Sequence, residues 1–464
     1  MHAIYYQHPG TWFGDCMPFC DSDGTFYLYH QRDTRVPGPF GEPFGWALAR
    51  TRDFVTYEDL GESLERGADD AQDQFIFAGS VFEADGTYYA MYTGFNRDYP
   101  AQGRPSQVLM VATSTDLIRW TKTGRNLVAP QPGYDQDDWR DPFVLWDEDA
   151  QRYLMILGAR TDEDGRILTG RTVSFTSTDL ESWDFHGDFW APGLYTMHEM
   201  PDLFRMGDRW YLLATEYSDR SKTVYRMSES LAGPWTAPVD DAFDGRAYYA
   251  ARSAADGDRR FLFGWVATKE DEDDRLPWQW GGTLVVHEVY QRDDRSLGVR
   301  PPDTVLASFG PARDLVAEPV TIGDGDGLAE IAVCADSGDP FRWETTLRFE
   351  PGTRSFALRL FEDPVSGDGY VFSFDVGEQR LVFDRRPNYP WNRYDNKGLE
   401  RPLTLGPEID HTIQVIADDS IATVYVDGVA LNARMYAKAG TSLGVQVIDG
   451  TLVVGSSLLR SRPA

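Results

Sequence analysis

The sequence of 464 residues predicts an all-β fold built from two unlike parts. Helical periodicity is scarce, and short runs of aromatic and β-branched residues alternate with Gly, Asp and Pro, as in chains of short strands. A repeating unit fills the first part of the chain, which is typical of radial β-architectures. The second part has longer runs of alternating polarity, which are typical of antiparallel sandwiches.

The repeat shows first as a turn followed by a strand that carries an aromatic residue. Its five copies read DGTFYLYH, DGTYYAMY, AQRYLMIL, GDRWYLLA and DRRFLFGW. Successive copies are 62, 64, 58 and 50 residues apart, as measured between the aligned aromatic residues Tyr27, Tyr89, Tyr153, Tyr211 and Phe261. A second motif follows the first four copies, at Asp53–Tyr57, Asp116–Trp120, Asp179–Trp183 and Ser230–Trp235. Units of this size predict propeller blades, and five copies predict five blades.

The repeat ends near residue 305, and Gly310 and Pro311 break the strand pattern soon after it. Longer strands of alternating polarity follow, such as WETTLRFE and ATVYVDGVALNARMYA. We therefore predict a five-bladed β-propeller over residues 1–307 and a C-terminal β-sandwich over residues 308–464. For the sandwich we favour a supporting role, or a dimer contact, over carbohydrate binding.

Composition and charge exclude several classes of partner. The chain has 74 acidic and 44 basic residues and a formal net charge of −30, which opposes binding to nucleic acid or to an anionic membrane. No stretch approaches the roughly 20 apolar residues of a membrane helix. The N-terminal residues lack the basic segment and apolar run of a signal peptide. We expect a cytoplasmic protein that acts on a small neutral molecule, and the sequence leaves open whether it forms a homo-oligomer.

The cysteines agree with that compartment. The chain has three of them, Cys16, Cys20 and Cys334, an odd number without the spacing of a metal site. We therefore expect reduced thiols, as in cytoplasmic proteins.

Three acidic residues stand at one position of the repeat. Asp15, Asp141 and Glu199 each precede the aromatic residue of their copy by 12 residues. The first strand of each propeller blade lines the central axis, so we expect equivalent positions on three blades to meet at one end of the channel. A single acid at a strand start more often caps a turn or pairs with Arg, but three in register favour a shared site. Glycoside cleavage needs one ionised and one protonated carboxyl group.

The motifs around these acids resemble glycoside hydrolase family 32, the family of invertases, inulinases and levanases. RDPFVL resembles its Arg-Asp-Pro motif, HEMPDLF its Trp-Glu-Cys-Pro-Asp-Leu-Phe motif, and FAGSVF its Phe-Ser-Gly-Ser segment. LFGWV and PWQWGGTLVV resemble later family segments. The resemblance spans nearly the whole chain. It implies a five-bladed propeller with a β-sandwich, and retaining hydrolysis of β-D-fructofuranosides of the sucrose, fructo-oligosaccharide or fructan type.

Carried over by motif, the resemblance also implies residue roles. Asp15 would be the nucleophile, Glu199 the acid/base, and Asp141 the residue that stabilises the transition state by binding sugar hydroxyls. Arg140 would orient the acids, and the other substrate-binding positions would be Trp12, Gln31, Trp46, Phe77, Ser80 and His198, of which His198 has an equally good interpretation as a packing residue. Asp202 is expected to anchor its strand. This chemistry needs no metal ion and no organic cofactor.

The nucleophile segment departs from the family pattern. The family usually reads Trp-Met-Asn-Asp-Pro-Asn-Gly, and this chain reads WFGDCMP, so Gly14 replaces the amide-bearing Asn before the nucleophile. His198 and Met200 replace Trp and Cys beside the acid/base. Cys16, Met17 and Pro18 replace the Pro-Asn-Gly that follows the nucleophile, so a second amide is lost. Two lost amides remove hydrogen bonds to a bound sugar, so we expect altered substrate discrimination.

Three other functions stay open at this point. One is fructosyl transfer, either to another sugar or within one chain to form a cyclic dianhydride. Another is a glycosidase for a different furanoside, such as an arabinofuranoside, although the complete Arg-Asp-Pro motif and the attached sandwich argue against the inverting arabinan-type enzymes. The third is a non-catalytic sugar-binding propeller, against which stands the retention of all three acids in register.

Overall fold

The protein, described by a computed structural model over residues 2–124, 127–163, 165–389 and 394–463, consists almost entirely of strands. Its helices are short and lie at η1 (Pro100–Gln102), η2 (Glu270–Glu272) and α1 (Asp303–Ala307). Across the described ranges, none of these helices has the length and apolar character that crossing a membrane demands. The prediction of an all-β fold is confirmed.

The first nineteen strands form five consecutive antiparallel groups along the chain. The first group is β1 (Trp12–Cys20), β2 (Phe26–Asp33), β3 (Trp46–Thr51) and β4 (Glu58–Leu64). The second is β5 (Phe75–Ala84), β6 (Thr87–Phe95), β7 (Gln107–Ser114) and β8 (Thr121–Lys122). The third is β9 (Tyr134–Asp147), β10 (Arg152–Thr161), β11 (Gly170–Ser177) and β12 (Asp184–Trp190). The remaining two are β13 (Glu199–Met206), β14 (Arg209–Glu216) and β15 (Lys222–Ser228), then β16 (Tyr248–Ala255), β17 (Arg260–Lys269), β18 (Trp278–Gln291) and β19 (Leu297–Arg300).

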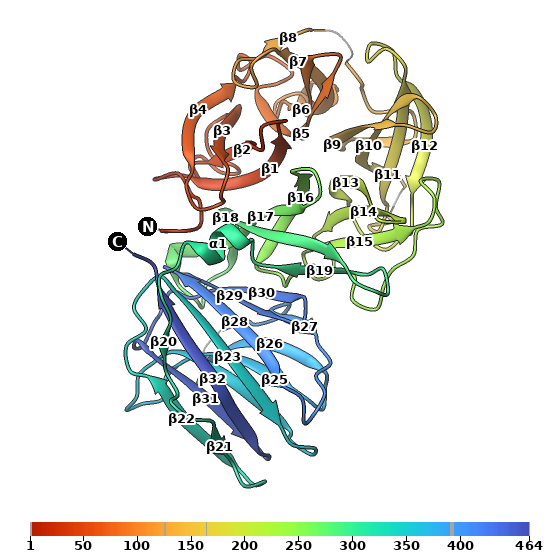
Figure 1. Ribbon diagram of the computed structural model, residues 1–464. Coiled ribbons are helices and arrows are strands. Elements are labelled where there is room, and N and C mark those ends of the chain that lie inside the picture. Colours follow the sequence, from red (N-terminus) through yellow and green to blue (C-terminus); the bar gives the residue numbers. More distant parts are fainter. Residues whose placement is uncertain (1, 125–126, 164, 390–393, 464) are drawn as a thin grey trace.

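The first strand of each group lies toward the middle of the upper body in Figure 1. These strands contact one another in order: β1 with β5, β5 with β9, β9 with β13, β13 with β16, and β16 with β1. Phe13 in β1 pairs with Gly282 in β18, so the first and last groups share one eight-stranded sheet. Residues that are far apart in the sequence therefore meet around one centre.

Both sequence motifs of the repeat have a structural counterpart. The five aligned aromatic residues all lie on the second strand of their group, at β2, β6, β10, β14 and β17. The second motif forms a tight turn after the third strand. In its first three copies a carboxylate oxygen of Asp53, Asp116 or Asp179 accepts backbone N–H bonds from the residues two and three positions ahead. This is the local pattern by which Asp favours turns.

The last thirteen strands form two antiparallel sheets in the lower body of Figure 1. One sheet has the order β20-β32-β23-β28-β29-β30, with β21 also paired to β32, and the other has the order β22-β31-β24-β25-β26-β27. Their bounds are β20 (Arg313–Asp314), β21 (Val320–Ile322), β22 (Leu328–Cys334), β23 (Phe341–Phe349), β24 (Ser355–Glu362), β25 (Gly369–Asp375), β26 (Arg380–Arg386), β27 (Glu400–Pro402), β28 (His411–Asp418), β29 (Ile421–Val426), β30 (Val429–Arg434), β31 (Ser442–Ile448) and β32 (Leu452–Ser461). Apolar residues alternate inward, as Phe341, Trp343, Leu347 and Phe349 do along β23.

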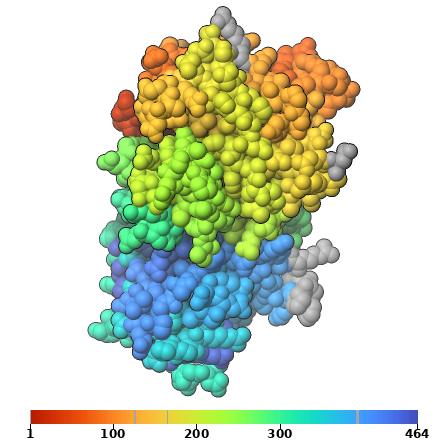
Figure 2. Space-filling model, turned by 90° about the vertical axis from the view of Figure 1, so that its right-hand side faces the viewer, coloured from red at the N-terminus to blue at the C-terminus, as the bar shows by residue number. Residues whose placement is uncertain are grey.

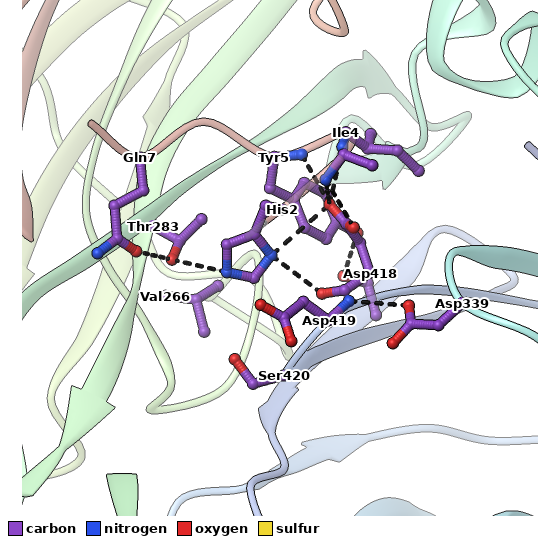
Figure 3. A network of polar contacts seen from close by, with 12 residues as sticks. His2, Ile4, Tyr5, Gln7, Val266, Thr283, Asp339, Asp418, Asp419 and Ser420 are labelled. Carbon is purple, nitrogen blue, oxygen red and sulfur yellow. Dashed lines mark hydrogen bonds and ion pairs between the residues drawn. The ribbon is translucent and has the colours of Figure 1, made fainter. Parts of the chain in front are cut away.

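The N-terminal segment, residues 2–7, contacts both the upper and the lower body, as Figure 3 shows. The backbone N–H groups of residues 3–5 donate to the carboxylate of Asp418, at the end of β28, over 2.8–3.1 Å. His2 Nδ1 lies 3.0 Å from the Asp418 carbonyl oxygen, and His2 Nε2 lies 3.3 Å from Thr283 Oγ1 in β18. One short segment therefore contacts both the sandwich and the last strand group.

A second set of contacts lies deeper in the junction between the bodies. Asp244, in the connection between β15 and β16, accepts hydrogen bonds from Asn432 N and Asn432 Nδ2 in β30, at 2.7 and 2.6 Å. Lys222 Nζ donates to the Glu400 carbonyl oxygen at 3.3 Å. In Figure 2 the green surface of the upper body lies directly on the blue surface of the sandwich. The junction is thus continuous and carries buried polar contacts.

Candidate active site

A pocket of about 210 Å³ lies where the first strands of the groups come together. Asp15 reaches it from β1, Asp141 from β9 and Glu199 from β13. The structure therefore brings all three predicted acids into one cavity. The full lining consists of Asp15, Gln31, Phe40, Phe44, Phe77, Phe95, Gln107, Arg140, Asp141, Glu199 and Trp280.

The acids reach the pocket because the pairing of their strands is interrupted there. A β-bulge breaks the register of β1 around Asp15, of β9 around Asp141, and of β13 just after Glu199. Bulges bend a strand and re-aim its side chains, and they are frequent next to active sites. The residues opposite the three acids all lie four positions beyond the aromatic residue of the repeat, at Gln31, Leu157 and Thr215. The common repeat position thus becomes a common structural position.

Arg140 holds the acids relative to one another. Its Nη2 lies 2.8 Å from Glu199 Oε1, and its Nε lies 3.9 Å from Asp141 Oδ2. Its Nη1 lies 2.6 Å from Asp138 Oδ1, and Asp138 also binds Arg160 at 2.9 Å. Burial lowers the pKa of the Arg140 guanidinium, but the three carboxylates more than offset it and the net shift is upward. Arg140 is therefore a fixed positive charge with its donors already engaged.

Glu199 has a second partner on the opposite side. The hydroxyl of Tyr249, in β16, donates to Glu199 Oε2 at 2.5 Å. Burial and the neighbouring Glu199 raise the pKa of Tyr249 well above its ordinary value, so its hydroxyl keeps its proton. Glu199 therefore accepts one bond at each carboxyl oxygen, from Arg140 and from Tyr249.

Asp15 has far fewer partners. Trp265 Nε1, from β17, donates to Asp15 Oδ1 at 3.2 Å. Burial, and then the negative charges of Asp141 and Glu199, raise the pKa of Asp15 well above its ordinary value. Asp15 is thus a carboxyl group held near like charges and left open toward the pocket.

Asp141 lies at the base of the pocket and is 2% exposed. Its backbone has φ of 63°, in the left-handed region, and its own N–H donates to Thr93 Oγ1 at 2.9 Å. Its Oδ2 accepts a bond from the Met200 N–H at 2.9 Å, while Arg252 Nη2 donates to its carbonyl oxygen at 2.7 Å. Burial raises the pKa of Asp141. A strained and well-anchored backbone of this kind fixes the direction of one side chain.

The other predicted binding residues divide into two sets. Gln31 and Phe77 line the pocket, as Arg140 does, whereas Trp12, Trp46, Ser80 and His198 do not. Trp46 is fully buried and its Nε1 donates to the Phe77 carbonyl oxygen at 3.0 Å. Ser80 Oγ accepts a bond from the Val144 N–H at 3.2 Å. Trp46 and Ser80 therefore support the strands that carry the pocket wall.

Trp12 and His198 also point elsewhere. Trp12 lines a separate pocket next to the sandwich, and the Arg35 guanidinium lies 4.4 Å above its ring. His198 is fully buried, its Nδ1 lies 3.0 Å from Thr172 Oγ1, and its ring lies 4.6 Å from that of Trp190. Burial lowers the pKa of His198 to about 3, so the ring is neutral and acts as a packing residue.

Asp202 occupies the anchoring position expected for it. It is fully buried, and its Oδ2 accepts bonds from Ser253 N at 2.7 Å and Ser253 Oγ at 2.6 Å. Ser253 lies on β16, so Asp202 joins the fourth strand group to the fifth.

Several functional residues were missed by the sequence reasoning. Five of them line the pocket (Phe40, Phe44, Phe95, Gln107 and Trp280), and Tyr249 and Trp265 contact the acids. Phe40, Phe77, Phe95 and Trp280 form an aromatic wall, with ring centroids 4.4 Å apart for Phe77–Phe95, 5.5 Å for Phe40–Phe77 and 5.9 Å for Phe40–Trp280. Trp265 and Trp280 stand in the segments LFGWV and PWQWGG, which resemble family segments, and this was the signal available.

The pocket is thus lined by both charged and aromatic side chains. Such a surface suits a sugar, which presents hydroxyl groups at its edge and C–H groups on its face. Among the residues that the structure describes, no cluster of three or more His, Cys, Asp and Glu side chains is arranged to hold a metal ion.

Comparisons with known proteins agree with this site. Residues 5–301 match the family described as Glycosyl hydrolases family 32 N-terminal domain. The chain is 26% identical to a sucrose-6-phosphate hydrolase of Escherichia coli, with 93% of this chain and 89% of that protein covered. It is 23% identical to a levanase of Bacillus subtilis, with 85% and 60% covered.

Its fold matches that of fructan 1-exohydrolase IIa from Cichorium intybus with a TM-score of 0.80, at 16% identity, over 100% of this chain and 97% of that one. The family match covers more than half of the chain and includes all three acids of the pocket. The chain therefore belongs to glycosyl hydrolase family 32 and is a glycoside hydrolase.

Proposed function

We propose that the protein hydrolyses β-D-fructofuranosides with retention of configuration. The observation that carries this proposal is the convergence of Asp15, Asp141 and Glu199 around Arg140 in one pocket. Sucrose 6-phosphate, levan and fructan, which appear in the names of the proteins compared above, are all fructosides. The proposal extends that shared substrate chemistry to this chain.

The three acids take distinct roles in the proposed reaction. Asp15 attacks the anomeric carbon and forms a covalent glycosyl-enzyme, while Glu199 gives a proton to the departing oxygen. Glu199 then takes a proton from the water that hydrolyses the intermediate. Asp141 accepts hydrogen bonds from sugar hydroxyls, and these strengthen as positive charge develops on the ring.

The electrostatics of the pocket set the pH range of this reaction. Attack requires Asp15 to be ionised, and burial together with its acidic neighbours raises the pKa of Asp15. The free site therefore holds a proton up to a higher pH than an ordinary Asp does. Activity should fall on the acidic side as Asp15 becomes protonated.

The size of the pocket favours action at a chain end. Its volume of about 210 Å³ is below the range of roughly 300–1,000 Å³ that is common for drug-sized ligands. A pocket of this size suits one terminal fructosyl residue better than an internal stretch of a polymer. We therefore propose exo-action.

The charges of the pocket favour an unphosphorylated substrate. Among the described residues that line this pocket, Arg140 is the one basic side chain, and Glu199, Asp138 and Asp141 already surround it. The phosphate of sucrose 6-phosphate is on the glucosyl residue, outside a pocket that holds the fructosyl residue, and it carries about −1.5 to −2 charges at pH 7. As it approaches the mouth of the pocket it would meet an acidic site and no free basic partner among the described lining residues. We therefore propose sucrose or a fructo-oligosaccharide, rather than sucrose 6-phosphate, as the substrate.

We further propose that residues 1–307 form a closed five-bladed propeller. The cycle of contacts from β1 through β5, β9, β13 and β16 back to β1 supports this architecture, as does the pairing of β1 with β18. The sandwich would begin at residue 308, directly after α1. The three cysteines are free, which agrees with the proposed cytoplasmic location.

The reaction class is tested with a panel of substrates. The purified protein is incubated with sucrose, 1-kestose, sucrose 6-phosphate and an aryl α-L-arabinofuranoside, and products are separated by chromatography. We expect free fructose from sucrose and 1-kestose, at a rate at least about 10-fold above that from sucrose 6-phosphate. Longer oligosaccharides or a cyclic dianhydride would instead indicate a transferase. Cleavage of the arabinofuranoside alone would contradict the fructoside proposal, and binding without any product would indicate a sugar-binding protein.

The stereochemistry is tested with Glu199→Ala and sodium azide. Without a group to protonate the departing oxygen or activate water, the variant should be slow on sucrose and faster on a fructoside with a good leaving group. Azide should then trap the glycosyl-enzyme as β-D-fructofuranosyl azide, whose configuration NMR can assign. Formation of the α-azide would contradict retention.

A further inference from the structure

Gly14, directly before the proposed nucleophile, lies against the indole of Trp280. A Cβ atom at position 14 would lie 2.3 Å from Trp280 Cη2, 3.0 Å from Trp280 Cζ3 and 3.1 Å from Gln31 Cβ. A contact of 2.3 Å is too short for a real Cβ atom, so a larger residue at position 14 must displace the indole. The ring of Trp280 therefore fills the space that a side chain at position 14 would take.

The backbone does not explain why this residue is glycine. Gly14 is absent from the residues with positive φ, which is the conformation that favours glycine. It lies within β1, in the bulge that also contains Asp15. Close approach of another group is the remaining reason for a glycine in a strand, and here that group is the Trp280 ring.

Trp280 connects this position with both sides of the pocket. Its ring centroid lies 5.5 Å from that of Trp265, whose Nε1 donates to Asp15, and 5.9 Å from that of Phe40 in the aromatic wall. Trp280 also lines the pocket beside Asp15 and Gln31. A ligand that reaches Asp15 therefore meets the indole.

The sandwich holds the loop that leads to Trp280. Asp274, between β17 and β18, is 1% exposed, and its Oδ1 accepts a bond from the Tyr436 N–H at 3.0 Å. The Tyr370 hydroxyl donates to Asp274 Oδ2, and the Lys269 ammonium group donates to the Asp274 carbonyl oxygen. Because these contacts fix the loop, the indole cannot easily move aside for a larger residue 14.

We propose that Gly14 and Trp280 act as one specificity-determining pair, in which the indole provides a stacking surface for the sugar ring that enters beside Asp15. A polar side chain at position 14 would donate or accept hydrogen bonds with the sugar. In this protein the Trp280 ring takes that place and makes an apolar contact with the C–H face of the sugar instead. This inference deepens the proposed function and rests on it, because it assumes that the sugar at Asp15 is a fructosyl residue.

The inference is tested by a double-mutant cycle of Gly14→Ala and Trp280→Phe. The Phe ring lacks the two indole atoms that lie closest to Gly14. In the wild-type background, Gly14→Ala should raise KM for sucrose about 10-fold, with kcat within about threefold, because a stacking contact acts in the ground state and the transition state alike. In the Trp280→Phe background, the same change should raise KM by less than about twofold. Affinity for D-fructose, measured by titration calorimetry, should fall by the same factors.

Trp278→Ala is the matched control. Trp278 lies on the same strand, two residues earlier, and its ring packs under the Lys269 ammonium group at 4.7 Å rather than lining the pocket. This variant should keep KM within about twofold, and thermal unfolding confirms that each variant is folded. If Gly14→Ala does not fold alone but folds with Trp280→Phe, that rescue is itself the coupling the pair predicts.

Three outcomes overturn the inference. The first is an equal effect of Gly14→Ala in both backgrounds, which would mean that the two residues act independently. The second is a loss of kcat with unchanged KM and fructose affinity, which would mean that Trp280 acts only through Trp265 and Asp15. The third is an unchanged KM in Gly14→Ala. If the wild type binds D-fructose through this pair but hydrolyses no fructoside, the pair stands and the proposed function fails.

Discussion

Two sets of aspartates in this molecule have opposite electrostatic surroundings. Asp15 and Asp141 lie in the pocket, beside Glu199, and burial and acidic neighbours raise their pKa values. Asp244 and Asp418 lie at the junction with the sandwich and are 3% and 1% exposed, against 2% for Asp141. Burial alone would raise the pKa values of both junction aspartates, yet both are lowered. Asp141 is buried to the same extent as Asp244 and Asp418, so burial does not explain the difference.

Hydrogen-bond donors explain why the pKa values of the junction aspartates are lowered. The Asp418 carboxylate accepts bonds from the backbone N–H groups of residues 3–5, and His2 lies beside it. Asp244 accepts bonds from the Gly245 N–H and from Asn432, and His287 Nε2 lies 3.1 Å from its Oδ2. Asp15 has a single indole donor and two carboxyl neighbours. The carboxylates of the junction aspartates have their hydrogen-bond donors within the protein and stabilise the fold. Asp15 keeps acceptor capacity that a substrate can use.

The largest effect is expected for Asp15→Asn. Removing the proposed nucleophile should lower kcat by at least about 10⁴-fold, since a group that acts within a catalytic unit cannot be replaced by its neighbours. The same change should stabilise the fold. The pKa of Asp15 is raised in the folded state, so the ionised group opposes folding at neutral pH, by about 1.4 kcal/mol for each pKa unit. The free energy of unfolding in urea at pH 7 should therefore rise by at least about 1 kcal/mol.

The exposed residue Asp149 provides the control for this prediction. Asp149→Asn should change neither kcat nor the free energy of unfolding by a measurable amount. If Asp15→Asn lowers both kcat and the free energy of unfolding, Asp15 stabilises the fold as Asp418 does, and the difference between pocket and junction aspartates is wrong.

The next effect is expected for Asp418→Ala, and it should have the opposite sign. Three backbone N–H groups lose their acceptor, so the free energy of unfolding should fall by about 2–4 kcal/mol at pH 7 while kcat of the folded enzyme is unchanged. The pKa of Asp418 is lowered, so its contribution is present above the unfolded pKa of about 3.9 and is lost as pH falls through the folded value.

Asp418→Asn separates the charge of Asp418 from its role as an acceptor. An amide oxygen can still accept N–H bonds, so this variant should lose less stability at pH 7 than Asp418→Ala. Between pH 7 and pH 3, the free energy of unfolding should also fall less for Asp418→Asn than for the wild type. Equal acid sensitivity of Asp418→Asn and the wild type would contradict a role for the ionised Asp418.

The contrast between pocket and junction also shows what the sequence could predict. Short motifs and the register of the repeat singled out the three acids, Arg140, Gln31 and Phe77, and all six line one pocket. The all-β fold followed from the same regularity. Motifs did not separate residues that line the wall from residues that support it. Trp46 and Ser80 stand in motif positions, yet they bind the backbone behind the pocket.

The residues that were missed depend on long-range contacts. Trp265 is 250 residues from Asp15, and Tyr249 is 50 residues from Glu199. Both come from the last strand group, which reaches the acids because β16 contacts β1 and β13 and β17 contacts β1. The junction contacts have the same character, since residues 3–5 meet Asp418 across almost the whole chain. The segment LFGWV singles out Trp265, but no local pattern in the sequence shows which distant residue it contacts, and Tyr249 alone looks like an ordinary strand residue.

The smallest effect is expected for Trp265→Phe, which removes the hydrogen bond that the indole N–H donates to Asp15. Trp265 supplies the hydrogen bond that lowers the pKa of Asp15, against burial and the charges of Asp141 and Glu199. Without it the pKa of Asp15 should rise further, so the acidic limb of the kcat/KM profile should move to higher pH by about 0.5–1 unit. At higher pH, where Asp15 is ionised in both proteins, kcat should fall only about threefold.

The direction of that shift distinguishes a donor from a packing residue. A Trp265 that only filled space would lower kcat at every pH and leave the acidic limb in place. Phe keeps the aromatic contact with Trp280, whose centroid lies 5.5 Å away, so the change isolates the indole N–H. Trp146→Phe is the matched control, because Trp146 is partly exposed and packs on Tyr153 outside the pocket. If the acidic limb of the kcat/KM profile moves in Trp265→Phe but not in Trp146→Phe, the hydrogen bond from the Trp265 N–H limits the rise in the pKa of Asp15.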